Sequence, residues 1–280
     1  MMYYILVNPL SNNGSSVETL QVLEEQLNTK TIKYTSLNLI EVSQNVNEFI
    51  AKLTQEDDVV IVGGDGTLHR FANEIRDKVI PCQIYLYKAG TGNDFSREFK
   101  KQRLINITKY VNDLPFFSVS DREELFLNCT GFGVDGEVCA LVNGMQSSKR
   151  GINYFKNAIK TFKSFKRYDL EVFVDGVRHT FKKVWIATVM NGKYFGGGMK
   201  LSPTSNRDDD VLEAYIIHSL GFWKLLFVFP LIFIGKHLWF KKLGISVLKG
   251  RNFEFYASEA QMLQSDGEVT KGVKSFKVVK

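Results

Sequence analysis

The sequence predicts two domains of different fold class: an N-terminal α/β domain with a parallel sheet in residues 1–115, and an antiparallel β-sandwich domain with inserted helices in residues 116–280. Three observations lead to this prediction. Strand-like apolar runs alternate with helical stripes in the first third of the chain, which is the order of βαβ units. Beyond about residue 115, strand-like runs instead follow one another with turn signals between them. The 280 residues are too many for one typical domain and suffice for two.

Short apolar runs in the first domain predict four strands, at residues 3–7, 32–35, 59–62 and 84–87. Between them, apolar residues recur at helical spacing over residues 17–27, 42–53 and 68–75. The stripe at 42–53 is the clearest in the chain. Strands that alternate with helices in this way pair in parallel.

In the second domain, Leu170, Val172 and Val174 alternate with polar or exposed-type positions, and Asp175-Gly176 follows as a hairpin signal. Four further runs predict strands, at residues 184–190, 211–217, 246–248 and 253–256. Two segments with helical patterns, 148–165 and 222–240, interrupt the strands. We allow that the last strand returns to the first domain.

The cysteines argue for a reducing compartment. There are three, Cys82, Cys129 and Cys139, with no CxxC spacing, so neither a disulfide framework nor a zinc site is indicated. The opening MMYYILVNPLS has no basic segment and too short an apolar run for a signal peptide. We therefore expect a cytoplasmic protein.

Charge is divided unevenly along the chain. Residues 1–145 hold 13 Lys/Arg and 19 Asp/Glu, whereas residues 146–280 hold 23 and 11. The two halves are thus expected to meet different partners, and the basic half suits nucleic acid or an anionic membrane.

The strongest local signal is a glycine-rich turn, Gly63-Gly64-Asp65-Gly66-Thr67, between a buried strand and a helix. In a parallel sheet such a turn lies at the carboxyl end of the strands, where ligands bind. Glycines let backbone N–H groups approach a phosphate, the helix N-terminus favours an anion, and Asp65 could hold Mg²⁺. The alternative is a plain tight turn in which the aspartate caps the helix.

A second turn, Gly90-Thr91-Gly92-Asn93-Asp94, follows the next strand, and the pair predicts one shared crevice. The sequence has no GxxxxGK(S/T) loop and no HRD and DFG pattern, which argues against P-loop enzymes and protein kinases.

These two motifs, GGDGT at 63–67 and GTGNDFSR at 90–97, resemble the diacylglycerol kinase catalytic domain family, which also includes sphingosine and ceramide kinases. Further motifs fall in the family's order over nearly the whole chain. They are Asn8-Pro9, Asn128 with Gly131-Phe132-Gly133 and Asp135, Asn191-Gly192 with Gly196-Gly197-Gly198, Pro203 with Asp209 and Leu212, and Asp266-Gly267-Glu268.

The resemblance implies an ATP site in the first domain and Mg²⁺ as cofactor. The matching ATP-binding positions are Asn8, Pro9, Thr35, Gly63, Gly64, Asp65, Gly66, Thr67, Thr91 and Asn93. Asp94 would help to shape the catalytic crevice.

The final motif is implied to supply the proton acceptor, Glu268, with Asp266 beside it. Phosphoryl transfer to a hydroxyl needs such an acceptor. Without the family, an exposed hairpin turn is the favoured interpretation of Asp266-Gly267-Glu268. Which of the two carboxylates is the base stays open.

A structural Mg²⁺ occurs in some bacterial relatives, and the matching ligands here are Asn206, Asp209 and Val211. Carboxylate and carbonyl oxygens suit this ion. The sequence departs from the family at Asp210, where glycine is usual, and at His69-Arg70, where Asn-Glu is common. An exposed acidic loop is the alternative for residues 208–210.

A mid-chain GxGxxG, residues 131–136, also matches a dinucleotide fingerprint. No Asp or Glu occurs from 145 to 168, so the ribose-binding acid is absent and we set this interpretation aside.

Two segments favour a lipid surface. Residues 148–167 carry seven Lys/Arg and no acid around a helical apolar stripe, which fits either an anionic bilayer or a core helix with a basic outer face. Residues 222–234 are apolar with Trp223 and Trp239 flanking, too short to span a bilayer.

We therefore predict an ATP- and Mg²⁺-dependent kinase that phosphorylates a lipid hydroxyl, diacylglycerol foremost, at the inner face of the membrane. Its partner is a lipid substrate at an anionic surface rather than nucleic acid, and we allow for a homodimer. The alternatives are a soluble-substrate kinase of the NAD-kinase type and a lipid-binding protein with a decayed active site.

Overall fold

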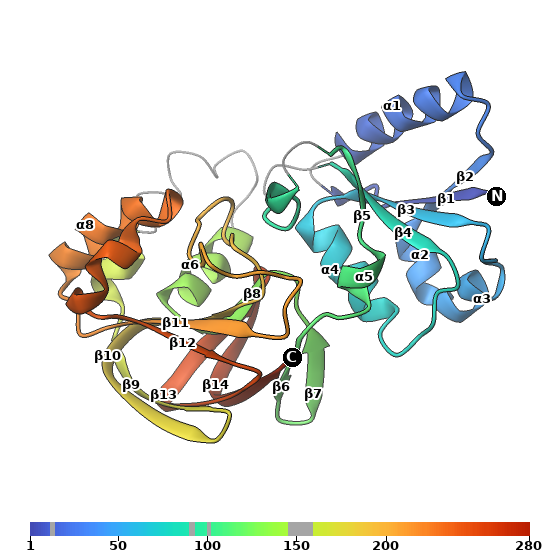
Figure 1. Ribbon diagram of the computed structural model, residues 1–280. Helices are drawn as coiled ribbons and strands as arrows, with labels where there is room; N and C mark the ends of the chain where they lie inside the picture. The colour runs from blue at the N-terminus through green and yellow to red at the C-terminus, as the bar shows by residue number, and fades with distance from the viewer. Residues whose placement is uncertain (12–14, 90–92, 100–101, 145–158) are drawn as a thin grey trace. The chain divides into compact units, whose positions relative to one another are not determined.

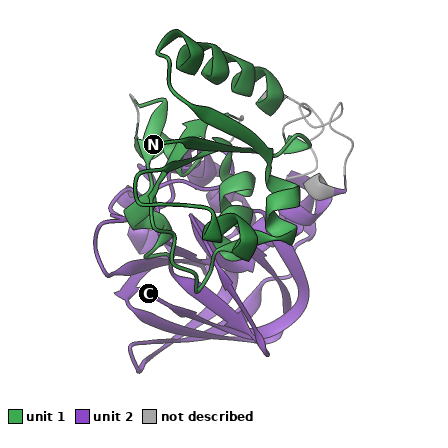
Figure 2. Cartoon of the chain, turned by 90° about the vertical axis from the view of Figure 1, so that its right-hand side faces the viewer, with its two compact units in different colours: residues 1–114 green, residues 115–280 purple. Residues whose placement is uncertain are grey.

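The computed structural model describes residues 1–11, 15–89, 93–99, 102–144 and 159–280. The chain divides into two compact units, Met1–Leu114 and Pro115–Lys280 (Figure 2). This division lies next to the boundary that the sequence analysis places after residue 115.

Unit 1 is the predicted α/β domain with a parallel sheet. Its elements are β1 (Tyr3–Val7), α1 (Ser15–Thr29), β2 (Tyr34–Asn38), α2 (Leu39–Gln44), α3 (Val46–Ala51), β3 (Asp58–Gly63), α4 (Asp65–Glu74), β4 (Gln83–Lys88), η2 (Ser96–Glu98), β5 (Leu104–Asn106) and α5 (Thr108–Val111). The strand order is β2-β1-β3-β4-β5, with β5 alone antiparallel to its neighbour.

The sheet of unit 1 is covered on both faces. Leu23 and Leu27 of α1 pack on the face that carries Ile5 and Val60. Helices α2, α3 and α4 lie on the opposite face (Figure 1). Every residue of β3 is buried, which explains its continuous apolar run.

One predicted helix of unit 1 is wrong in its bounds. The stripe at 42–53 forms two helices, α2 and α3, because the backbone of Asn45 leaves the helical region (φ −134°, ψ 43°). The apolar stripe survives the break, since Phe49 and Leu53 are still buried.

Unit 2 is the predicted antiparallel β-domain with inserted helices. Its elements are β6 (Phe116–Val119), β7 (Arg122–Leu125), β8 (Cys129–Gly133), α6 (Val134–Asn143), β9 (Tyr168–Val174), β10 (Val177–Met190), β11 (Leu212–His218), α8 (Phe222–Phe233), η4 (His237–Leu243), β12 (Ile245–Gly250), β13 (Asn252–Ser265) and β14 (Glu268–Val279). All of its strand pairs are antiparallel.

Two long strands, β10 and β13, fold the sheet of unit 2 over on itself. Each pairs with β9 along one half and with β8 along the other. The interior between the layers is rich in aromatic rings, among them Phe132, Phe255 and Phe276. The last strand, β14, pairs with β13 and β6, so it stays in unit 2 and does not return to the first domain.

Two Asp-Gly hairpins shape this sheet. At the predicted turn, Asp175 and Gly176 have φ values of 48° and 83°, and Asp266 and Gly267 repeat the pattern at 47° and 96°. Positive φ at both central residues fits the hairpin turn that matches strand twist. The second hairpin joins β13 to β14 and carries the predicted catalytic motif.

The predicted helix 148–165 lies mostly outside the described residues. Its described end, 159–164, is helical, and Thr161 and Phe165 are buried. The ring of Phe162 contacts Phe229 of α8, with centroids 5.5 Å apart. This end therefore packs on the core. Over the described residues, no helix is both long and apolar enough to cross a bilayer.

Candidate functional site

Three polar turns lie at one edge of the unit 1 sheet. Strands β1, β3 and β4 are parallel neighbours, and Val7, Val62 and Tyr87 stand in register near their carboxyl ends. Asn8-Pro9 follows β1, Gly64-Asp65 follows β3, and the segment containing Asn93 follows β4. The described part of the second turn, Asn93-Asp94, lies beside the GGDGT turn, because the N–H of Asp94 donates to the Asp65 carboxylate. Residues 90–92, Thr91 among them, lie outside the described residues.

The GGDGT turn is built for close approach to its helix. A Cβ atom at Gly63 would lie 2.5 Å from Cβ of Thr67, so only glycine fits there. Gly64 is the N-cap of α4 and offers no side chain to its N–H groups, and the space beside Gly66 is open. The helix therefore presents its amino end without a side-chain cap, as an anion site requires.

Asp65 does not cap its own helix, contrary to the plain-turn alternative. Its carboxylate accepts hydrogen bonds from the N–H groups of Asp94 (2.6 Å) and Phe95 (3.1 Å). The side chain thereby ties the turn after β3 to the segment after β4. Asp94 is buried, and its carboxylate lies 3.4 Å from Nε of Arg97. Two carboxylates thus stand at this edge, an arrangement suited to a hard cation.

Asn8 orders the turn after β1. Its side-chain oxygen accepts the N–H of Leu10 (3.0 Å), and its carbonyl accepts the N–H of Ser11 (3.1 Å). Pro9 lies in the same turn and is partly exposed.

Thr35 is placed elsewhere. It is the second residue of β2 and pairs with Tyr4, so it lies toward the amino end of the parallel strands. The residue of β2 at the carboxyl edge is Asn38, which pairs with Val7. The side-chain oxygen of Asn38 accepts the N–H of Ile40. β2 begins two residues later than the predicted strand 32–35 and ends at Asn38, which the prediction did not include.

In unit 2, the two acids of Asp266-Gly267-Glu268 differ in their surroundings. The Asp266 carboxylate accepts three backbone N–H groups, from Leu127 (2.5 Å), Asn128 (2.8 Å) and Cys129 (3.2 Å). Glu268 is exposed at the start of β14. Asp266 is therefore engaged in holding backbone, whereas Glu268 is accessible to a substrate.

Two further side chains contact the segment held by Asp266: Asn191, part of a predicted motif, and Arg207, which was not predicted. Arg207 is buried and donates to the carbonyl of Leu127 and, at 2.6 Å, to the side chain of Asn128. Asn191 donates to the same Leu127 carbonyl at 2.9 Å. The partners of Arg207 lie 80 and 79 positions earlier in the chain, so no local pattern marks it as a contact residue.

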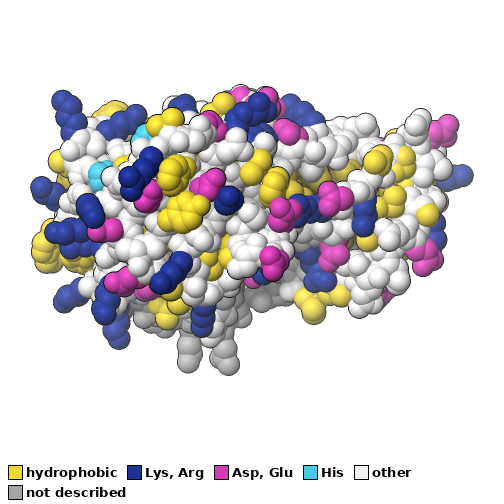
Figure 3. All heavy atoms as spheres, turned by 90° about the horizontal axis from the view of Figure 1, so that it is seen from below, with side chains coloured by type: hydrophobic (Ala, Val, Ile, Leu, Met, Phe, Trp, Pro, Cys, Tyr) yellow, Lys and Arg dark blue, Asp and Glu magenta, His cyan; other side chains and the backbone are white. Residues whose placement is uncertain are grey.

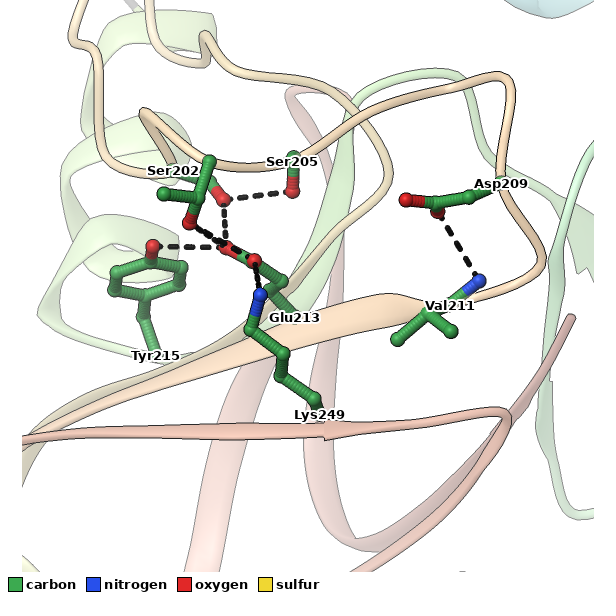
Figure 4. A network of polar contacts seen from close by, with 8 residues as sticks. Ser202, Ser205, Asp209, Val211, Glu213, Tyr215 and Lys249 are labelled. Carbon is green, nitrogen blue, oxygen red and sulfur yellow. Dashed lines mark hydrogen bonds and ion pairs between the residues drawn. The ribbon is translucent and has the colours of Figure 1, made fainter.

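The predicted metal ligands Asn206, Asp209 and Val211 lie in one turn, which is closed by hydrogen bonds among these three residues. The Asp209 carboxylate accepts the N–H of Val211 at 3.2 Å (Figure 4). The carbonyl of Asn206 accepts the N–H of Asp209 at 3.4 Å. Asp210 has no positive φ, so the backbone does not need the family's glycine there. Among the described residues, no cluster of three His, Cys, Asp or Glu side chains could hold a metal.

Next to this turn, Glu213 forms a buried network (Figure 4). Its carboxylate accepts from the hydroxyls of Ser202, Thr204 and Tyr215 and pairs with Lys249 at 2.5 Å. Burial by itself raises the pKa of Glu213, but the bonds from Lys249 and the hydroxyls outweigh it and leave that pKa below its ordinary value. The network anchors the loop that carries residues 202–211 to β11.

The mid-chain GxGxxG serves close packing. A Cβ atom added at Gly131 would lie 2.3 Å from a carbonyl oxygen of β10, and one added at Gly133 would lie 2.6 Å from another. A Cβ atom added at Gly136 would lie 2.9 Å from the carbonyl oxygen of Met262. Between these glycines, burial raises the pKa of Asp135 to about 6. Its Oδ1 is buried without a hydrogen-bond partner.

The fold and these turns define a two-domain protein in which an α/β domain, with a glycine-rich turn at the carboxyl ends of its parallel strands, precedes a β-rich domain. Residues 2–114 match the family described as diacylglycerol kinase catalytic domain. Residues 128–278 match the YegS C-terminal NAD kinase beta sandwich-like domain. The chain therefore belongs to the diacylglycerol kinase catalytic domain family, in its YegS-like form.

Similar proteins agree with this assignment. YtlR of Bacillus subtilis, provisionally named a lipid kinase, is 23% identical, with 95% of this chain and 93% of YtlR covered. A diacylglycerol kinase of Mycobacterium tuberculosis H37Rv is 24% identical over 83% of this chain and 78% of its own. A crystal structure of a provisionally named diacylglycerol kinase from Bacillus anthracis Sterne superposes with a TM-score of 0.73 at 22% identity, covering 99% and 91% of the two chains.

Proposed function

We propose that the protein is an ATP-dependent kinase that phosphorylates a lipid hydroxyl, with diacylglycerol as the acceptor. The observation that carries the proposal is the edge of the unit 1 sheet, where the uncapped N-terminus of α4 adjoins Asp65 and Asp94. Backbone N–H groups at a helix N-terminus bind phosphate, and carboxylates bind the accompanying Mg²⁺. The names of the relatives favour a lipid acceptor over NAD.

Each residue then has a distinct task. The Gly64–Thr67 turn binds the phosphates of ATP, and Asp65 orients the Asp94 segment through its two hydrogen bonds. Asp65 and Asp94 would hold Mg²⁺, which neutralises charge on the phosphates. Asn8 and Asn93 border the same edge.

In unit 2, Glu268 accepts the proton of the lipid hydroxyl as its oxygen forms a bond to the γ-phosphorus and the bond to ADP breaks. Asp266 is a positioning residue, because both of its oxygens accept backbone N–H groups. We therefore propose Glu268, and not Asp266, as the proton acceptor.

The test is a panel of acceptors with labelled ATP: diacylglycerol, monoacylglycerol, sphingosine, ceramide and NAD, each with Mg²⁺. We expect label in the product of a lipid acceptor, with diacylglycerol the best. Label in NAD phosphate alone would replace the proposal by the soluble-substrate alternative. Lipid binding with no label in any product would replace it by the decayed-site alternative.

A further inference from the structure

Helix α8 is apolar on two opposite faces. Leu225, Val228 and Ile232 are buried in the core of unit 2. On the outer face, Trp223 is 78% exposed and Phe227 is 64% exposed. Surface helices of globular proteins normally have a polar outer face, so this one is fitted to an apolar partner.

The following segment, η4, continues the same surface. The ring of Phe227 meets that of Phe240 edge to face at 5.7 Å, which joins α8 to η4. Trp239 is 74% exposed, and Nζ of Lys236 lies 4.8 Å from the centre of its ring. We call this surface the α8–η4 patch; its exposed apolar residues are Trp223, Phe227, Phe233, Ile234, Trp239 and Leu243.

Every Asp, Glu, Lys or Arg position from residue 222 to residue 243 is a lysine. The exposed ions of the two elements are Lys224, Lys236, Lys241 and Lys242. No Asp or Glu occurs between Glu213 and Glu254. Figure 3 shows Lys and Arg side chains, in dark blue, interspersed with Asp and Glu side chains, in magenta, over the left part of one face.

The combination of exposed apolar side chains and lysines favours an anionic bilayer, rather than a second copy of the chain, as the partner of the patch. Two copies joined through the patch would set lysines against lysines with no acid from either patch to offset them. A bilayer with anionic headgroups supplies both hydrocarbon and negative charge. Helix α8 has 12 residues, about 18 Å, so it lies in the interface rather than crossing it.

We propose that the α8–η4 patch docks the protein on an anionic phospholipid bilayer. Trp223 and Trp239 insert at the boundary between acyl chains and headgroups, and Lys241 and Lys242 contact the headgroups. The proposal rests on the proposed function, which requires a lipid acceptor, and it names the surface through which the enzyme reaches that acceptor.

The three tryptophans provide a direct readout. Trp185 is buried and its Nε1 donates to the carbonyl of Leu220, so its emission should stay constant, whereas Trp223 and Trp239 face solvent. With vesicles of phosphatidylcholine and phosphatidylglycerol, and no ATP, we expect a blue shift of emission and quenching by brominated acyl chains. Vesicles of phosphatidylcholine alone should produce a weaker response.

Paired variants test the patch by vesicle sedimentation. The double variant Trp223→Ala/Trp239→Ala should lower the vesicle partition coefficient at least tenfold. The double variant Lys241→Glu/Lys242→Glu should lower it by the same factor at low salt. The matched controls, Val79→Ala with Val177→Ala and Lys30→Glu with Lys33→Glu, alter exposed residues elsewhere and should leave partition unchanged. Circular dichroism should show every variant folded.

Two results would overturn the docking proposal: wild-type partition by both patch variants, or a dimer in solution that shields both tryptophans from a soluble quencher. Activity on short-chain diacylglycerol in detergent micelles separates this from the proposed function. A protein active in micelles but indifferent to vesicles contradicts the docking alone. One that binds vesicles through the patch yet phosphorylates nothing contradicts the kinase assignment and leaves the docking intact.

Discussion

Asp65 connects two turns that are distant in sequence, because its carboxylate accepts N–H groups of Asp94 and Phe95. Asp65→Asn keeps the shape of the side chain but replaces one of the two accepting oxygens by an NH₂ group. That group cannot accept a hydrogen bond, so one of the two backbone N–H groups loses its acceptor. We expect turnover to fall at least about 10²-fold, as for loss of a charge-stabilising group. We also expect Tm to fall by several degrees, since a hydrogen bond to a charged group contributes about 1.5–3 kcal/mol.

Steady-state assay and thermal melting of purified protein measure both effects. Asp77→Asn is the matched control, because Asp77 is an exposed acid of unit 1 whose positive φ of 62° asparagine tolerates. Turnover at the wild-type level in Asp65→Asn would remove this carboxylate from the mechanism.

Glu268 and Asp266 are expected to respond differently to loss of charge. Glu268→Gln should lower kcat by roughly 10²–10⁴-fold and leave Tm unchanged, because Glu268 is an exposed proton acceptor. It should also abolish the acid limb of the pH profile of kcat. Glu259→Gln changes an exposed glutamate of β13 and is the control, which should behave as wild type.

Asp266→Asn should lower Tm and kcat together and keep the shape of the pH profile. An asparagine leaves at least one of the N–H groups of Leu127, Asn128 and Cys129 without its acceptor. If instead Asp266→Asn abolishes the acid limb and Glu268→Gln does not, the roles of the two carboxylates are reversed.

At this scale, sequence reasoning identified the edge of unit 1 and the Asp266-Gly267-Glu268 turn. It could not identify the task of a carboxylate, because Asp266 and Glu268 differ only in contacts made with Leu127, Asn128 and Cys129, far away in the chain. Nor could it assign Arg207, whose partners are equally distant. Thr35 came from the resemblance alone, and its pairing with Tyr4 depends on the register of β2, which the sequence pattern does not encode.

At the scale of elements, the junction of β8 and α6 carries a buried charge. Burial raises the pKa of Asp135 to about 6, above the value of about 3.9 in an unfolded chain. The folded state therefore binds this proton more tightly than the unfolded state does. The resulting stability is fully present below about pH 4 and is lost as the pH rises through 6.

Asp135→Asn removes this dependence. We expect the variant to melt several degrees above wild type at pH 7.5, with the difference disappearing near pH 4. Asp121→Asn changes an exposed acid of the β6–β7 turn and is the control. Melting curves with a constant difference across this range would show that Asp135 is ionised at the same pH in both states.

Elements with a strong periodic signal were predicted best. β3 and β4 appear where their apolar runs are, and the Asp175-Gly176 hairpin is confirmed. β14 was missed because lysines occupy its exposed positions and hide the alternation. The break at Asn45 depends on how α2 and α3 pack, which periodicity does not encode.

At the scale of the whole molecule, the order of the elements predicted the two fold classes correctly. Parallel pairing of β2, β1, β3 and β4 and antiparallel pairing throughout unit 2 confirm the change of pattern near residue 115. Unit 1 holds 12 Lys/Arg and 14 Asp/Glu, and unit 2 holds 24 and 16, so unit 2 is the basic one. The proposed ATP site lies in unit 1 and the α8–η4 patch in unit 2. What periodicity could not supply was the partner of β14, which only the folded sheet reveals.

The central claim is that this chain transfers a phosphoryl group from ATP to diacylglycerol. The most direct measurement is mass spectrometry of the lipids after incubating diacylglycerol, in vesicles with phosphatidylglycerol, with Mg²⁺ and ATP labelled by ¹⁸O in its γ-phosphoryl group. We predict phosphatidic acid that carries the ¹⁸O label with wild-type protein, and a loss of at least about 10²-fold with Asp65→Asn and with Glu268→Gln. Unlabelled diacylglycerol recovered intact with wild-type protein, or equal label with all three proteins, would contradict the claim.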